Sequence, residues 1–156
     1  MTDRNELKEI DVLISFFKER NTSARNSEAQ RTNITNFVIT ISGALIALIG
    51  YIGFLIYTLP IAIIIVILGI YGAIMSAKLY ERFQYHNSVA KSYERQINEL
   101  CPRIDTKLLI RSARKKHKKE FPRLYNMRLN KLWLFLHISI IILGIICIFI
   151  IVFNFF

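Results

Sequence analysis

The chain has 156 residues, of which 53% are hydrophobic and 21% are charged, and its formal net charge is +10. A soluble domain usually carries about 25% charged residues, so the apolar excess must be concentrated in part of the chain. Residues 32–77 and residues 132–156 contain no charged side chain. Uncharged runs of about 18 residues or more are candidates for membrane spans, which argues against a compact soluble enzyme.

The charged residues are distributed unevenly along the chain. Residues 1–31 hold six basic and six acidic residues, whereas residues 78–131 hold fifteen basic and five acidic ones. The whole net charge therefore belongs to residues 78–131, and the bias of Lys and Arg toward the cytoplasmic side predicts that this segment is cytoplasmic. We expect a multi-pass protein of the inner (plasma) membrane with its N-terminus inside and its C-terminus outside.

The first uncharged block is long enough for two spans. Its 46 residues would extend roughly 69 Å as one helix, about twice the thickness of a bilayer core. Pro60 lies near the centre of the block and predicts a tight hairpin over residues 36–77, with spans at 37–59 and 61–77. All six glycines fall within predicted spans, where small residues indicate close helix contacts. With the third span at 132–156, the expected fold is an all-α membrane protein with three transmembrane helices.

Residues 1–35 are predicted to form a cytoplasmic amphipathic helix followed by a polar neck. Within residues 3–20, apolar side chains recur at helical spacing, as in Leu7, Ile10, Ile14 and Phe17. This apolar face could pack on the rest of the protein or lie on the membrane surface. Residues 21–35 either continue the helix into the first span or form a flexible neck.

The second span continues into the longest periodic pattern of the chain. Positions spaced alternately by three and four residues run without a break from Gly69 to Leu100, as expected of a coiled coil or helical bundle. We therefore predict one helix from Ile61 to about Leu100. Its packing partner is either another copy of the chain or the first and last helices of the same chain. The seam residues are Gly69, Gly72, Ser76, Leu79, Phe83, His86, Ala90, Tyr93, Ile97 and Leu100.

Residues 78–131 form the basic helical segment that precedes the third span. Asp105 or Thr106 can cap a helix that ends in a strongly basic run, Pro102 ends the preceding helix, and Pro122 suits the first turn of the last helix. Such a run binds either anionic lipid headgroups or a polyanion such as a nucleotide or oligonucleotide. The predicted ligand-binding residues are Arg111, Arg114, Lys115, Lys116, Lys118 and Lys119.

The sequence contains no recognisable catalytic, cofactor-binding or metal-binding pattern, so an enzyme is not expected. His86 on the seam is either a packing residue or a proton-sensitive switch. His137 lies about one turn inside the third span, where it either turns back to the interface or serves a gating function. Small residues at helical spacing are candidates for helix packing or for lining a pore: Gly43, Ala47, Gly50, Gly69, Gly72, Ala73 and Ser76.

Three stretches look like motifs of an uncharacterised bacterial three-span family: Lys78–Asn87, Phe121–Tyr125 and Arg128–Trp133. In its architecture, with a polar helical N-terminus, a tight hairpin, a helical stalk and a basic cytoplasmic segment, the chain resembles small bacterial membrane effectors of antiviral defence. It is similar in plan to SLATT-type effectors and to the channel effector of Hailong-type systems. That resemblance implies a membrane effector paired with an enzyme that makes a nucleotide or oligonucleotide.

Two functions are consistent with these features. The first is a homo-oligomeric channel or membrane-disrupting effector in the lipid bilayer, gated by a nucleotide or oligonucleotide on the basic segment. The second is a membrane scaffold without channel activity that recruits a soluble partner. A small transporter is disfavoured because no acidic residue lies in any predicted span and no inverted repeat is visible.

Overall fold

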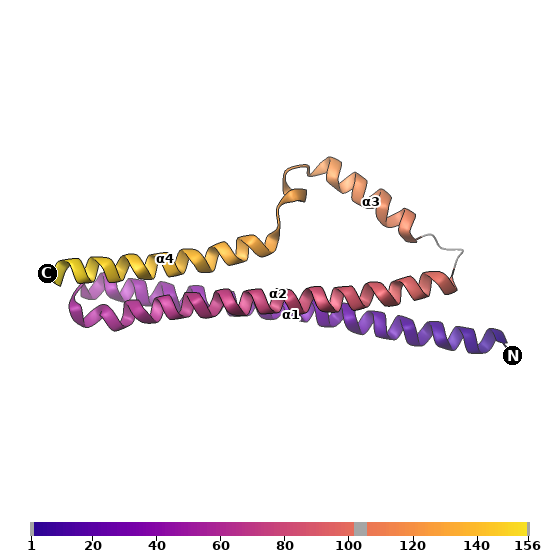
Figure 1. Cartoon of the computed structure of the whole chain (residues 1–156), viewed down its shortest axis with the longest axis horizontal. Helices are drawn as coiled ribbons and strands as arrows, with labels where there is room; N and C mark the ends of the chain where they lie inside the picture. The colour runs from indigo at the N-terminus through magenta and orange to yellow at the C-terminus, as the bar shows by residue number, and fades with distance from the viewer. Residues whose placement is uncertain (1, 102–105, 156) are drawn as a thin grey trace. The chain divides into compact units, whose positions relative to one another are not determined.

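The computed structural model describes residues 2–101 and 106–155, with side chains for residues 7–101 and 108–155. The described residues form helices joined by short turns, and they contain no strand (Figure 1). Three of these helices, α1, α2 and α4, are long and apolar enough to span a membrane, as predicted. In chain order the elements are α1 (Thr2–Ile52), the 3-10 turn η1 (Ile56–Thr58), α2 (Leu59–Leu100), α3 (Thr106–Glu120), the 3-10 turn η2 (Leu124–Asn126) and α4 (Leu129–Phe155).

Helix α1 is continuous from the polar N-terminal region into the first apolar block. Residues 21–35 are helical throughout. Of the two alternatives for this segment, the structure therefore has the continuous helix and not the flexible neck. The sequence permits this because residues 2–42 contain neither glycine nor proline, the two residues that most weaken a helix interior. Helix α2 extends from Leu59 to Leu100, which confirms the single long helix predicted from the seam.

The turn between α1 and α2 lies earlier than predicted. Helix α1 ends at Ile52, and Gly53 adopts a positive φ of 101°, a conformation that glycine tolerates better than other residues. The Thr58 hydroxyl donates a 2.7 Å hydrogen bond to the carbonyl oxygen of Leu55, and its oxygen lies 3.3 Å from the carbonyl oxygen of Gly53. Pro60 lies in the first turn of α2, where its missing N–H costs little. Placing the turn at Pro60, and Gly53 inside a span, was therefore wrong.

The chain forms two units, and the second contains the apolar part of each long helix. This unit takes in α1 from Ser27, α2 as far as Glu81, and α4. Glycines bring α2 and α4 close together: a Cβ built on Gly69 would lie 2.6 Å from Ile141 Cγ1, and one built on Gly144 would lie 2.7 Å from Val66 Cγ2. Because later residues of α2 meet earlier residues of α4, these two helices are antiparallel.

The seam of α2 is an intramolecular packing surface. In the second unit, Gly69, Gly72, Ser76 and Leu79 are buried; in the first unit, the seam residues from Phe83 to Ile97 are buried or half-buried, and only Leu100 is exposed. The seam therefore supports the intramolecular bundle that we considered beside a contact between copies. Helix α4 has a matching pattern of buried residues at three- and four-residue spacing: His137, Ile140, Gly144, Cys147 and Ile151.

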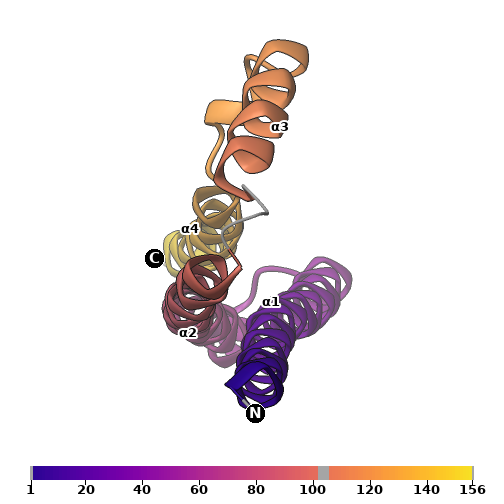
Figure 2. The same ribbon diagram turned by 90° about the vertical axis from the view of Figure 1, so that its right-hand side faces the viewer.

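The first unit takes in α1 as far as Asn26 and the chain from Arg82 to Arg128. Here the Phe16 ring stacks on Tyr93 of α2 with a centroid distance of 5.7 Å (Figure 2 shows α1 and α2 from the N-terminal end). A groove of about 490 Å³ is lined by apolar residues of three helices, among them Phe17, Ile97 and Leu109. The apolar face of the N-terminal helix thus packs partly on its own protein, although Leu7 and Val12 stay exposed.

Helix α4 also begins later than predicted. Pro122 was expected in its first turn, but α4 starts at Leu129, and the short turn η2 lies between them. The Asn126 side chain donates a 3.4 Å hydrogen bond to the Pro122 carbonyl oxygen within this connection. The predictions for Pro102 and Asp105 concern residues outside the described ranges, and Thr106 is the first residue of α3.

The close approach of α2 and α4 predicts that Gly144→Ala destabilises the protein. The added methyl group would overlap Val66 Cγ2, and overpacking of this kind costs about 1–3 kcal/mol of unfolding free energy. Ala77→Val is the control, because it adds bulk at an exposed position of α2 that is outside this contact. Thermal unfolding in mild detergent measures both variants, and equal Tm values for the two would contradict this packing.

Candidate functional site

The predicted polyanion-binding residues lie together on one exposed helix. Arg111, Arg114, Lys115, Lys116, Lys118 and Lys119 all belong to α3 and are all exposed. Arg111, Lys115 and Lys118 follow one another at four and three residues, so they share one face of the helix. Lys118 and Lys119 in the last turn also interact favourably with the negative end of the helix dipole.

Few interactions compete for these basic groups. Lys116 Nζ lies 4.0 Å from a carboxylate oxygen of Glu120, an exposed ion pair that contributes little stability. Lys118 Nζ lies 5.9 Å from the centroid of the Tyr125 ring, and His117 contacts both Tyr125 and Phe121. Aromatic rings therefore lie beside the basic residues at the C-terminal end of α3. This combination of cations and rings suits an anionic ligand that carries planar bases.

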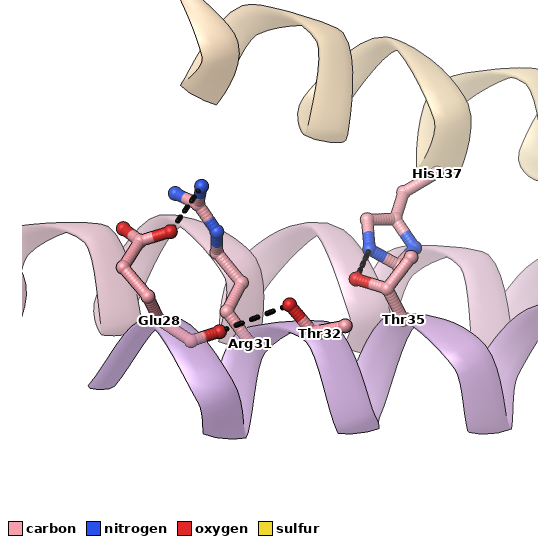
Figure 3. A network of polar contacts seen from close by, with 5 residues as sticks. All are labelled: Glu28, Arg31, Thr32, Thr35 and His137. Atoms are coloured by element: carbon pink, nitrogen blue, oxygen red, sulfur yellow. Dashed lines mark hydrogen bonds and ion pairs between the residues drawn. The ribbon is translucent and has the colours of Figure 1, made fainter. Parts of the chain in front are cut away.

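A second group of polar side chains lies inside the second unit, where α1, α2 and α4 meet, and Figure 3 shows Glu28, Arg31, Thr35 and His137 of this group. We call it the polar cluster: Glu28, Arg31, Thr35, Tyr80, Trp133 and His137. Arg31 is 2% exposed, and its Nη2 donates to Glu28 Oε2 at 2.8 Å one helical turn earlier. Because Arg31 is the last charged residue before the uncharged residues 32–77, this ion pair marks one end of the apolar part of α1.

Two aromatic rings flank the Arg31 guanidinium. Its Cζ lies 5.7 Å from the centroid of Tyr80 on α2 and 5.4 Å from the centroid of Trp133 on α4. Both distances fall within the range of cation–π attraction, which contributes about 0.5–2 kcal/mol per contact. One side chain of α1 thus contacts both of the other long helices.

His137 lies beside Thr35, which is one helical turn after Arg31 on α1. Its imidazole is fully buried, and Nε2 shares a 3.2 Å hydrogen bond with Thr35 Oγ1, whose direction depends on the imidazole tautomer. Nδ1 lies against the backbone of Gly72, so that any Cβ on residue 72 would overlap the ring. The imidazole thus lies between the helices, in contact with both α1 and α2.

Several buried donors of the polar cluster have no hydrogen-bond partner among the described residues. They are Nε and Nη1 of Arg31 and Nε1 of Trp133; the Nδ1 atom of His137 also lacks a partner there. Buried polar groups in folded proteins nearly always have a partner, and a charged donor without one is especially costly. Arg31 and Trp133 are in contact, so Nε and Nη1 of Arg31 and Nε1 of Trp133 form one group of donors.

The structure separates the small residues that we grouped as pore or packing candidates. Gly69, Gly72 and Ser76 are buried against other helices, and Ala73 is half-buried beside them. Gly43, Ala47 and Gly50 instead lie on the exposed face of α1, and nothing lies within 4 Å of a Cβ on either glycine. His86 is half-buried on the α2 seam of the first unit, and His137 belongs to the second unit.

The sequence interpretation missed Arg31, Glu28 and Thr35. The signal that could have identified them is the helical spacing of the buried residues of α1, which recur every three or four positions: Ala24, Ser27, Arg31, Thr35 and Val38. Three of these five residues are polar, so a search for apolar periodicity passes over them. The contact of Trp133 and Tyr80 with a buried cation was not predicted either.

The hydrogen bond between helices predicts a specific loss in Thr35→Val. The change keeps the shape of the side chain but leaves the buried His137 Nε2 without its partner, at a cost of about 1–3 kcal/mol. Ser139→Ala is the control, because the Ser139 hydroxyl donates only to the carbonyl oxygen of Phe135 in its own helix. A Tm of Thr35→Val no lower than that of Ser139→Ala in detergent would count against this contact.

The described contacts of the polar cluster are an ion pair, two cation–π contacts and a hydrogen bond between helices. Among the described residues, no group of three or more His, Cys, Asp or Glu side chains could hold a metal ion. Comparisons with protein-family models, curated proteins and solved structures find no match for this chain.

Proposed function

We propose that the protein is a homo-oligomeric channel or membrane-disrupting effector of bacterial antiviral defence. In this proposal, α1, α2 and α4 cross the inner membrane with the N-terminus inside and the C-terminus outside. The basic helix α3 then lies in the cytoplasm, where a nucleotide or oligonucleotide made by a partner enzyme binds it. The proposed defence role follows from the resemblance in plan to SLATT-type and Hailong-type effectors.

The outward face of α1 is the observation that supports an oligomer. Residues spaced alternately by three and four are exposed along it, directly opposite the buried residues Val38 and Ile49. The residues along the middle of this face are all polar or small. The bulky residues at its edges are Phe37, Ile39 and Leu48. We call it the outer α1 face: Asn33, Asn36, Thr40, Gly43, Ala47 and Gly50.

The outward faces of the other two helices differ in chemistry. Helix α2 exposes Ile67, Ile70 and Ile74, and α4 exposes Phe149 and Phe153, so both present bulky apolar groups that suit lipid tails. Amide and hydroxyl groups at membrane depth favour a partner that hydrogen-bonds with them, and small residues allow helices to approach closely. Other copies of α1, or water enclosed by them, meet this requirement better than lipid does.

An oligomer is also what a channel needs. Within one chain the second unit is a packed set of three helices, with buried apolar residues such as Ile65, Ile140 and Ile151 in contact with one another. Such a core leaves no path for ions, so a pore has to form between copies. The outer α1 face is the polar surface available for lining it.

We expect added bulk on the outer α1 face to weaken assembly. Gly43→Leu together with Ala47→Leu would keep the α1 helices apart and remove close contacts worth about 1 kcal/mol each, so that the monomer fraction rises. Ile67→Phe, which adds bulk to the outward face of α2, is the control and should assemble like the wild type. The mass of the detergent complex, measured by light scattering, reports the outcome; a wild type that is itself monomeric in both detergent and bilayers would refute the proposal.

Neutralising α3 tests the ligand site. In planar bilayers, short single-stranded oligonucleotides should change the conductance of the wild type, with an apparent affinity that falls steeply as salt rises. Replacing Arg114, Lys115, Lys116, Lys118 and Lys119 by Gln should lower that affinity at least about tenfold and flatten its salt dependence.

The control for this experiment is Lys91→Gln with Arg95→Gln, two exposed basic residues of α2 in the same unit. An unchanged oligonucleotide response in the α3 variant would remove α3 from the mechanism. Absence of conductance in an assembled wild type, under all ligand conditions, would favour the alternative function of a membrane scaffold that recruits a soluble partner.

A further inference from the structure

The donors around Arg31 form an arrangement that neither channel activity nor α3 explains. The guanidinium is 2% exposed, and Glu28 accepts a hydrogen bond from Nη2 alone. The two rings beside it attract the cation through their faces and accept no hydrogen bond in the plane of the guanidinium. Nε and Nη1 thus have no hydrogen-bond partner among the described residues, and the same holds for the indole Nε1–H of Trp133.

The position of this group along the helices indicates what it binds. Arg31 comes directly before the 46 uncharged residues 32–77, and Lys78 and Lys131 lie at the ends of the uncharged blocks that belong to α2 and α4. Cations at the ends of membrane spans lie at the depth of lipid headgroups, and basic pockets between helices on the cytoplasmic side bind phosphorylated headgroups. Tryptophan is likewise enriched at this depth, where its N–H meets polar groups.

We propose that Arg31 and Trp133 form a binding site for a phosphate group at the membrane surface. A phosphate group offers several anionic acceptor oxygens, enough for Nε and Nη1 of Arg31 and Nε1 of Trp133 together. Glu28 is 32% exposed in its side chain, and Trp133 is half-buried, so the site lies one side chain below the surface.

The ligand has two possible sources, a lipid headgroup and a free phosphate ion, and both present the same chemistry. The site belongs to the second unit and does not involve α3, so this inference holds whether or not the protein conducts ions. A failure of oligonucleotide gating would therefore leave it standing, and a failure of phosphate binding would leave the channel proposal standing.

Trp133 is the one tryptophan of the chain, so its fluorescence reports directly on the site. The full-length protein in uncharged detergent is titrated in three arms: with phosphatidylglycerol, with inorganic phosphate, and with a diacylglycerol of the same acyl chains. We expect a saturable change in fluorescence with phosphatidylglycerol and none with diacylglycerol. A response to inorganic phosphate as well assigns the site to the phosphate group itself, and a response to phosphatidylglycerol alone assigns it to a lipid.

Variants connect the signal to the proposed donors. Glu28→Gln with Arg31→Gln removes both charges together, and should raise the apparent Kd for phosphatidylglycerol at least about tenfold, as expected for loss of hydrogen bonds from a charged donor. Lys131→Gln removes an exposed cation at the same depth and should leave Kd within about twofold. Trp133→Phe keeps the ring but not the N–H, and should reduce the rise in Tm that phosphatidylglycerol produces.

The Trp133→Phe variant keeps the test decisive if the double variant does not fold. An equal response to diacylglycerol, or an unchanged Kd in the double variant, would overturn the proposal. So would a Trp133→Phe protein that phosphatidylglycerol stabilises as strongly as it stabilises the wild type.

Discussion

The approach of α2 and α4 at their glycines is the contact on which the second unit depends. Gly69 and Gly72 on α2 and Gly144 on α4 leave no room for a Cβ, so the two backbones lie closer than larger residues would allow. Between apolar helices in a membrane, such packing replaces the hydrophobic effect as the main source of association. This contact determines how closely α4 packs on α2. It therefore also places His137 beside Gly72.

That contact also creates the environment of the polar cluster. With α4 held against α2, Trp133 and Tyr80 flank Arg31 of α1, and His137 reaches Thr35. A cation in such a place is stable only with partners, and Glu28 and the two rings supply some of them. The remaining donors give the cluster a capacity to bind an anion that the apolar seams of the same helices lack.

Composition and periodicity predicted much of this fold, because three long apolar helices leave a strong signature in sequence. The seam from Gly69 to Leu100 was identified in full, since its alternation of three and four residues survives the change from small to large side chains. Turn positions were predicted less well: Pro60 suits a turn and also the first turn of a helix, and only the positive φ of Gly53 distinguishes these two roles. Arg31 escaped notice because a buried arginine depends on partners from two other helices, which are close in space and distant in sequence.

The central claim is that the outer α1 face meets other copies of the chain, while the outward faces of α2 and α4 meet lipid. Cysteine cross-linking in native-like vesicles tests it directly, in a background where Cys101 and Cys147 are replaced by Ala. Cysteine at Gly43 should form disulfide-linked dimers on mild oxidation, whereas cysteine at Ile67 should stay monomeric, because a disulfide requires Cα atoms within about 7 Å. Cross-linking at Ile67 as efficient as that at Gly43, or none at either position in an assembled protein, would contradict the claim.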